Sequence, residues 1–176
     1  AMDYRYFPEP DLPRVIISDE RLEKVKKEVP GVAITADIIV GFPGESEEDF
    51  DELIEFVKEA KIDRLGVFAF SDEEGTLSHR LDGKLPEDVK ENRRNIIMEL
   101  QVGISEELNQ NKIGKIFEVM VDEVQSESEY IGRTRYDAQE IDNEVNFNGK
   151  LAHKPGDIVH VKITEAYEYD LVGEEV

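Results

Sequence analysis

The sequence predicts an α/β segment, then a long helix, then a small all-β barrel. The first observation is an almost uninterrupted apolar run from Val32 to Val40, which is typical of a parallel strand buried on both faces. The second is a helical apolar period that continues from residue 86 to about residue 112. The third is a change of that period to 2 after Gly114, where five short strands predict an OB-like barrel.

The α/β segment is a β-α-β unit over residues 32–70. The first strand ends in the glycine-rich turn 41–44, and Ser46 is a good N-cap for a helix because Asp49 follows three residues later. Apolar residues then recur at helical spacing up to Ala60, and residues 65–70 form a second buried strand. The turn therefore lies at the carboxyl end of a strand, where α/β folds place their ligands.

Two more helices are expected around this unit. Ser18 caps a helix from Asp19 to about Val29, and the prolines before it indicate an irregular lead-in. Pro86 occupies the first position of the long helix, which ends near Lys112. The apolar stripe of the long helix is expected to consist of Val89, Ile96, Ile97, Leu100, Ile104 and Leu108.

The five barrel strands start with the alternation at Phe117, Val119 and Val121. The other four are expected over residues 130–135, 144–147, 157–164 and 169–174. In the fourth strand Val159, Val161 and Ile163 should face inward, with the polar residues between them facing water.

The charge balance narrows the range of partners. The 176 residues carry a formal net charge of −21, and residues 113–176 contribute 6 basic and 15 acidic side chains. A protein that grips a phosphate backbone needs a basic face, so this balance disfavours RNA and favours a basic polypeptide. An equally good interpretation is that the acidity only keeps the protein soluble. No apolar stretch approaches the ~20 residues of a membrane helix, and the expected location is the cytoplasm.

Several stretches carry a resemblance to a known family. Residues 37–50 resemble the fifth strand and following helix of radical S-adenosylmethionine methylthiotransferases, and residues 65–76 resemble their sixth strand and loop. Residues 132–142 and 168–173 resemble the TRAM domain of the RimO branch, which adds a methylthio group to an aspartate of a small-subunit ribosomal protein. The sister branch MiaB modifies tRNA and lacks a stretch like 137–142. The resemblance implies a partial radical-enzyme (β/α) barrel over residues 19–112 and a TRAM domain over residues 113–176.

The chain has no cysteine, although the family depends on it. Iron–sulfur clusters are held by cysteine thiolates, and these enzymes carry two sets of three. S-adenosylmethionine and the clusters are therefore cofactors of the full-length family, and none is expected on this chain alone. We expect no catalytic residue and no metal site. The three histidines, at positions 79, 153 and 160, share no metal spacing, and no nucleophile has an assignable base.

Ile39 and Gly41 are the cofactor-binding residues that the resemblance implies. They match the strand that borders the adenine of S-adenosylmethionine, through apolar contact and close approach of the backbone. Two departures weaken the match, because Asp37 replaces the first glycine of the pattern and Glu45 falls one residue late. The alternative is that the glycines only turn a strand into a helix.

Arg133, Arg135 and Tyr136 are the substrate-recognition residues that the resemblance implies. The arginines lie on one face of a predicted barrel strand with Tyr130 and Tyr136 beside them. Arginine alternating with aromatic residues is a common contact pattern on OB-like surfaces. A solvated outer face explains the same pattern equally well.

The first residues of the chain resemble a different family. Residues 3–13 and 17–20 resemble a signature of GatB, the tRNA-binding subunit of an amidotransferase, so residues 1–18 are interpreted as a GatB-like lead-in. Three hypotheses are open. The chain is the C-terminal part of a RimO-like enzyme that meets a small-subunit ribosomal protein, or a module that binds tRNA or other RNA, or a chimeric or designed chain without a selected function.

Overall fold

The structure, a computed structural model, describes residues 24, 27–29, 32–139 and 141–176. It divides into two compact units, residues 1–32 and residues 33–176. In the first unit Lys24, Lys27 and Glu28 have helical backbone, and the rest of the helix predicted over 19–29 lies outside the described residues. The GatB-like lead-in also lies outside them. The β-α-β unit, the long helix and the barrel all belong to the second unit.

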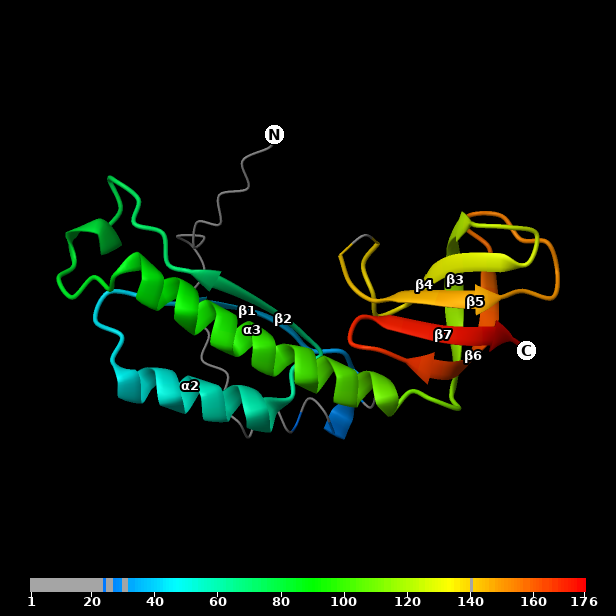
Figure 1. Cartoon of the computed structure of the whole chain (residues 1–176), viewed down its shortest axis with the longest axis horizontal. Coiled ribbons are helices and arrows are strands. Elements are labelled where there is room, and N and C mark those ends of the chain that lie inside the picture. Colours follow the sequence, from blue (N-terminus) through cyan, green and yellow to red (C-terminus); the bar gives the residue numbers. More distant parts are fainter. Residues whose placement is uncertain (1–23, 25–26, 30–31, 140) are drawn as a thin grey trace. The chain divides into compact units, whose positions relative to one another are not determined.

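The predicted β-α-β unit is confirmed (Figure 1). Strand β1 (Thr35–Val40) is followed by helix α2 (Glu47–Ala60) and strand β2 (Arg64–Ala69). The two strands pair in parallel, with Ile38 opposite Val67. Their covered side chains form one core with α2 and with the long helix, and its buried members are Val40, Phe50, Val57, Ala60, Ile62, Leu65, Val67, Ile97 and Ile104.

Helix α2 begins where its cap predicts. The Ser46 hydroxyl accepts a hydrogen bond from the Asp49 backbone N–H at 3.1 Å, and the Asp49 carboxylate accepts one from the Ser46 N–H at 2.8 Å. This reciprocal pair satisfies two backbone donors that the first helical turn would otherwise leave free. The helix ends at Lys61, whose φ of 44° reverses the chain toward β2.

The expectation that both faces of the sheet are covered is wrong. Ile39 is 60% exposed and Phe68 is 56% exposed, and the two lie side by side in the register of β1 and β2. Alternate residues of a strand point to opposite faces, so one row packs into the core and the row holding Ile39 and Phe68 stays open. Two strands with two helices bury only one face of this sheet.

The long helix α3 (Glu87–Gln110) starts one residue after the predicted position, with Pro86 as its N-cap. A short 3₁₀ helix, η1 (Ser78–Arg80), interrupts the loop before it. The predicted apolar stripe is partly wrong, because Ile96 is exposed and Ile97 and Ile104 are the buried isoleucines. The remaining buried positions of α3 are polar, namely Lys90, Arg93, Gln101, Ser105 and Asn109. Four of these side chains donate to acceptors outside α3, and Ser105 accepts from Gln101 within it. Hydrogen bonds therefore define the buried face of α3 as much as apolar contacts do.

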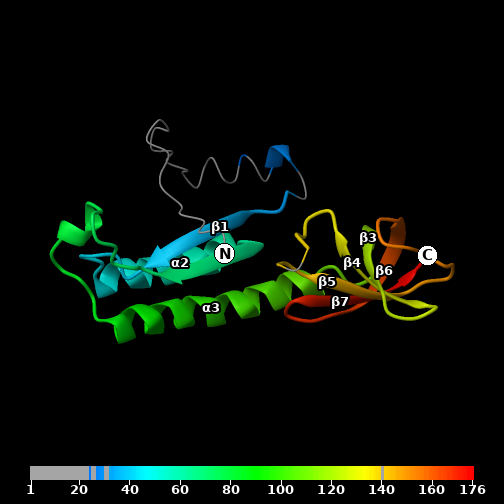
Figure 2. The same cartoon turned by 90° about the horizontal axis from the view of Figure 1, so that it is seen from above.

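The predicted five-stranded barrel is confirmed (Figure 2). Its strands are β3 (Ile116–Val124), β4 (Glu129–Thr134), β5 (Glu144–Asn148), β6 (Ile158–Ala166) and β7 (Asp170–Glu175). They close in the order β3-β4-β5-β7-β6, with β5 and β7 parallel and the other pairs antiparallel. In β6 the residues Val159, Val161 and Ile163 point inward as expected, and His160 and Lys162 are exposed. In the described part of the chain, no helix is long and apolar enough to cross a membrane.

The end of the barrel carries a carboxylate whose ionisation stabilises the fold. The Glu175 carboxylate lies 3.1 Å from His153 Nε2 and accepts a hydrogen bond from the Lys150 N–H. Burial alone would raise the pKa of Glu175, but the hydrogen bonds from His153 and the Lys150 N–H outweigh it and lower that pKa below its usual value.

We therefore predict that this stabilisation disappears in acid. The pKa of Glu175 in the folded state lies below the unfolded-state value of about 4.3. Its ionised form therefore stabilises the fold fully at a pH above about 4.3, and this stabilisation is lost as the pH falls through the folded-state pKa. The difference in the free energy of unfolding between wild type and Glu175→Gln should be present at about pH 6 and shrink toward about pH 3. Urea unfolding across this range measures it, with Glu174→Gln as the exposed control. A difference that stayed constant with pH would contradict the assignment.

Candidate functional site

The turn after β1 is closed by its own side chains. Gly41 and Gly44 adopt φ values of +77° and +91°, which favour glycine because other residues carry a Cβ that crowds the backbone there. The Gly41 N–H donates to Glu45 Oε2 at 2.9 Å. The other oxygen of Glu45 pairs with Arg93 of α3, a side chain that is only 3% exposed and also pairs with Glu47. The backbone of this turn is thus held by a buried ion pair.

The structure does not bring the two predicted cofactor-binding residues to one surface. Ile39 lies on the open face of the sheet and offers an apolar contact there. Gly41 is buried, and a Cβ added to it would lie 2.3 Å from Cγ of Lys90. The space that this glycine leaves is filled by Lys90, whose Nζ donates to the Phe70 carbonyl at 2.8 Å. Contact of Ile39 and Gly41 with S-adenosylmethionine remains a prediction.

The predicted recognition residues lie in less regular structure than expected. Strand β4 ends at Thr134, so Arg135 and Tyr136 belong to the following turn. Arg135 is exposed, with its guanidinium carbon 5.7 Å from the centre of the Tyr136 ring. Arg133 pairs with Asp122 of β3, which neutralises its charge locally. Recognition by these three residues remains a prediction.

Tyr130 does not belong to this surface. It is 2% exposed, stacks on Phe147 at 5.4 Å between ring centres, and packs inside the barrel. Its inward position follows from strand alternation, since Tyr130 and Arg133 are an odd number of residues apart in β4.

Arg64 links the barrel to the α/β segment. Arg64 is the first residue of β2, and its guanidinium forms an ion pair with Asp137. Its Nε also forms an ion pair with Asp142, at 3.5 Å from Oδ1. Both carboxylates come from the segment between β4 and β5, and the Asp137 side chain is fully buried. The Thr134 hydroxyl donates to the second oxygen of Asp137. One arginine thus holds the segment between β4 and β5 against the α/β segment.

The carboxyl end of α3 forms the second link. Asn109 Nδ2 donates to the carbonyls of Tyr167 at 2.9 Å and Glu168 at 3.1 Å, in the loop between β6 and β7. Asn109 Oδ1 accepts from Asn143 Nδ2 at 2.9 Å and from Lys112 Nζ at 3.0 Å. Burial lowers the pKa of Lys112, and the nearby Asp137 partly offsets this.

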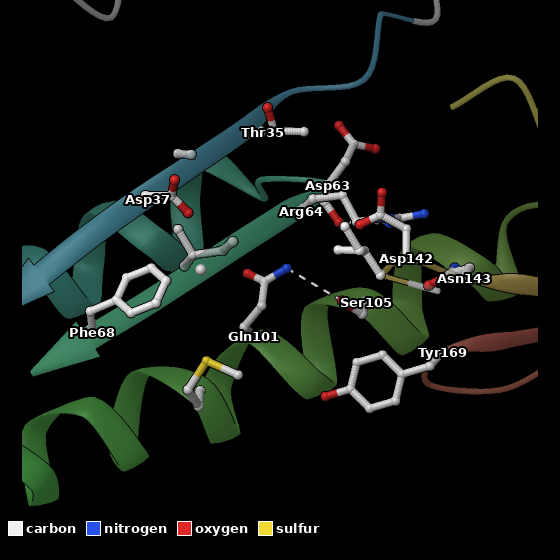
Figure 3. A pocket seen from close by; sticks show the side chains of 15 residues that line it. Thr35, Asp37, Asp63, Arg64, Phe68, Gln101, Ser105, Asp142, Asn143 and Tyr169 are labelled. Carbon is white, nitrogen blue, oxygen red and sulfur yellow. Dashed lines mark hydrogen bonds and ion pairs between the residues drawn. The ribbon is translucent and has the colours of Figure 1, made fainter. Parts of the chain in front are cut away.

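A cavity of about 640 Å³ lies beside these links (Figure 3). On the strand side it is lined by the open face of β1 and β2, including Asp37 and Phe68. On the opposite side Gln101 and Ser105 of α3 line it. The segment 141–143 and Tyr169 complete its walls.

Sequence reasoning does not identify the side chains around the cavity as site residues. Asp37 stands out only as an acid inside an apolar run, and Gln101 has no local signal. Among the described residues no group of three or more His, Cys, Asp or Glu side chains could hold a metal ion. His79 pairs with Asp72, and His153 with Glu175.

Comparison with known proteins shows what the chain is similar to. The family model of the TRAM domain matches residues 113–176. The chain is 46% identical over 154 residues to the ribosomal protein uS12 methylthiotransferase RimO of Flavobacterium johnsoniae, and the alignment covers 87% of the chain and 35% of that relative. It is 47% identical over 154 residues to RimO of Christiangramia forsetii, and this alignment covers 87% of the chain and 34% of that relative. It is 45% identical over 152 residues to RimO of Clostridium botulinum strain Loch Maree, and this alignment covers 86% of the chain and 34% of that relative.

The resemblance to RimO is confirmed. The chain spans about a third of the length of these relatives and corresponds to their C-terminal part, which contains the TRAM domain. RimO implies iron–sulfur clusters and S-adenosylmethionine. The residues present do not fit a cluster, since the chain contains no cysteine.

We predict that Arg64→Met uncouples the barrel from the α/β segment. Removing one partner of a buried ion pair leaves Asp137 buried without its counter-charge, so the free energy of unfolding should fall by about 3 kcal/mol. Arg94→Met is the matched control, because the Arg94 side chain is 43% exposed and pairs with Glu91 along the helix. Its loss should be within about 0.5 kcal/mol. Urea unfolding measures both, and equal losses would show that Arg64 has no special role.

Proposed function

We propose that this chain is the C-terminal, substrate-docking part of a ribosomal-protein aspartate methylthiotransferase of the RimO kind. The relatives are named for action on ribosomal protein uS12, and the similarity extends over 87% of this chain. The reaction requires clusters that this chain cannot hold, so its own contribution is a wall of the barrel and a surface for the substrate. The proposed location is the cytoplasm, where ribosomes are modified.

The charge of the TRAM domain is the observation that carries this proposal. Its 6 basic and 15 acidic side chains give it a net charge of −9. Of its two predicted recognition arginines, Arg133 is already paired with Asp122. A surface of this sign attracts a basic polypeptide and repels a phosphate backbone. A small-subunit ribosomal protein fits this requirement.

The open face of the sheet supports the barrel-wall role. Ile39 and Phe68 form an exposed apolar row on β1 and β2, and such rows are covered in complete α/β barrels. The turn beyond β1 is already rigid, because Glu45 and Arg93 hold it from inside the chain. This arrangement suits a preformed wall to which cluster-bearing parts of a longer protein add their own residues.

Binding of tRNA or other RNA is the second candidate function. Arg135 is exposed beside the Tyr136 ring, and an arginine next to an aromatic ring is a common contact for unpaired bases. A chimeric origin of the GatB-like lead-in would also suit a tRNA role.

A binding experiment separates the two. The immobilised chain is offered purified ribosomal protein uS12 and, separately, tRNA, at about 50 mM and about 200 mM salt. We expect retention of uS12 at both salt concentrations and little retention of tRNA, because the TRAM domain is strongly acidic.

The opposite pattern would support the second candidate. Retention of tRNA that falls about 10³-fold or more between the two salt concentrations would indicate neutralisation of many phosphates. If Arg135→Ala abolished that retention, Arg135 and Tyr136 would be the RNA contact. Failure to retain uS12 at either salt concentration would reject the proposed function.

A further inference from the structure

We propose that the cavity between the open sheet face and α3 binds a basic side chain of a polypeptide, an arginine or a lysine. The choice of a polypeptide rests on the proposed function, and the choice of a basic side chain rests on the cavity itself. The cavity is lined by residues 35–37 of β1 and by residues 64–66 and Phe68 of β2, and Gly41 in the turn after β1 is not among its lining residues. It is therefore separate from the predicted cofactor contact of Gly41.

Two unsatisfied polar atoms mark this cavity. In the part of the chain that the structure describes, Gln101 Oε1 and Arg64 Nε are the buried side-chain atoms without a hydrogen-bond partner, and both residues line the same cavity. Leaving a buried donor or acceptor unpaired costs about 1–3 kcal/mol, so such atoms are rare and call for a partner. Both residues line one cavity, and their unpaired atoms favour a ligand that carries a donor and an acceptor.

The orientation of Gln101 is fixed by its surroundings. Its side-chain amide nitrogen donates to the Ile62 carbonyl at 2.9 Å and to Ser105 Oγ at 3.3 Å. Gln101 is 5% exposed, and Figure 3 shows its amide rising from α3 toward β2. Because the nitrogen is held by these two acceptors, the oxygen is left as a buried acceptor without a partner, on a residue that lines the cavity. The missing partner must therefore be a donor.

Carboxylates make a charged donor the best ligand. Asp37 lies over Gly66 of the paired strand, and a Cβ on that glycine would be 2.4 Å from Asp37 Oδ1. The glycine thus makes the room in which this carboxylate sits. Asp37, Asp63 and Asp142 line the cavity against one arginine, Arg64. Three carboxylates and one guanidinium repel an anion and attract a cation.

The walls suit the aliphatic stem of a basic side chain. Phe68 and Met98 contribute apolar surface from β2 and α3, and the Phe68 ring is exposed on the open face. Arginine and lysine bury their methylene groups against such surface and keep the charged head among polar atoms. A guanidinium over an aromatic ring gains a further attraction. The volume, about 640 Å³, lies in the range of ordinary ligand pockets.

Arg64 explains why a peptide fits better than a free amine. Its Nε–H makes no hydrogen bond, and the Asp142 Oδ1 with which it forms an ion pair is 3.5 Å away. A peptide backbone supplies a carbonyl for this donor while its side chain supplies donors for Gln101 and Asp37. A simple amine supplies donors only.

The test compares two probes that differ only in charge. N-acetyl-arginine N-methylamide and its citrulline counterpart, which is nearly isosteric and neutral, are titrated into the ¹⁵N-labelled chain. We expect the arginine probe to shift the side-chain amide signal of Gln101 and the backbone signal of Gly66. It should bind at least about tenfold more tightly than the citrulline probe, because hydrogen bonds to charged groups are stronger.

A matched pair of variants checks that the cavity is the site. Asp37→Asn removes an exposed carboxylate at the cavity, and Asp51→Asn removes an exposed carboxylate on α2. The first should weaken binding of the arginine probe about tenfold, and the second by less than about twofold. Equal binding of the two probes, or equal effects of the two variants, would overturn the proposal.

The outcome is distinguishable from that of the proposed function. If the chain retains uS12 and Asp37→Asn binds it as tightly as Asp51→Asn does, the cavity is not used and the proposed function stands. If the arginine probe binds at Gln101 and uS12 is not retained, the cavity is a binding site for basic side chains and the proposed partner is wrong.

Discussion

The buried polar face of α3 is the constraint on which the second unit depends. Arg93 pairs with Glu45 in the turn after β1, Gln101 donates to the Ile62 carbonyl before β2, and Asn109 donates to two carbonyls between β6 and β7. Each of these partners is a specific atom, and an unpaired buried polar group costs about 1–3 kcal/mol. A sliding or rotation of α3 by one residue would break all three contacts together. An apolar helix face would tolerate such a shift far better. The buried polar side chains of α3 therefore fix its position along and around its axis.

Arg64 adds a second, electrostatic constraint at the same junction. It lies at the amino end of β2, and the two aspartates that it meets belong to the segment between β4 and β5. A buried pair is weak support for stability when compared with apolar contact, but it specifies which groups meet. Here it holds the segment between β4 and β5 against the α/β segment. Residues 33–176 accordingly form one compact unit.

Local patterns are sufficient to predict the elements, and they do not predict long-range pairing. The cap at Ser46, the β-α-β unit and the inward row of β6 depend on neighbours only a few residues apart, which the sequence displays directly. The Arg64–Asp137 pair joins residues 73 positions apart, and no local signal links them. The predicted stripe of α3 is partly wrong because apolar periodicity assumes an apolar partner surface, whereas α3 meets carbonyls and carboxylates. The open sheet face is not predictable from the strands, because burial of a strand depends on layers that its own sequence does not contain.

The two ends of the sheet differ in a way that bears on function. At the carboxyl end the Gly41 N–H donates to Glu45, and Lys90 fills the space beside that glycine. Side chains of the chain itself therefore occupy the positions that a ligand could take there. At the amino end Gln101 Oε1 and Arg64 Nε remain unpaired beside a cavity. Unused hydrogen-bonding capacity in a site whose orientation is fixed favours binding, because little order has to be created when a ligand arrives. The amino end of the sheet is therefore the place where unpaired polar groups of fixed orientation lie beside a cavity.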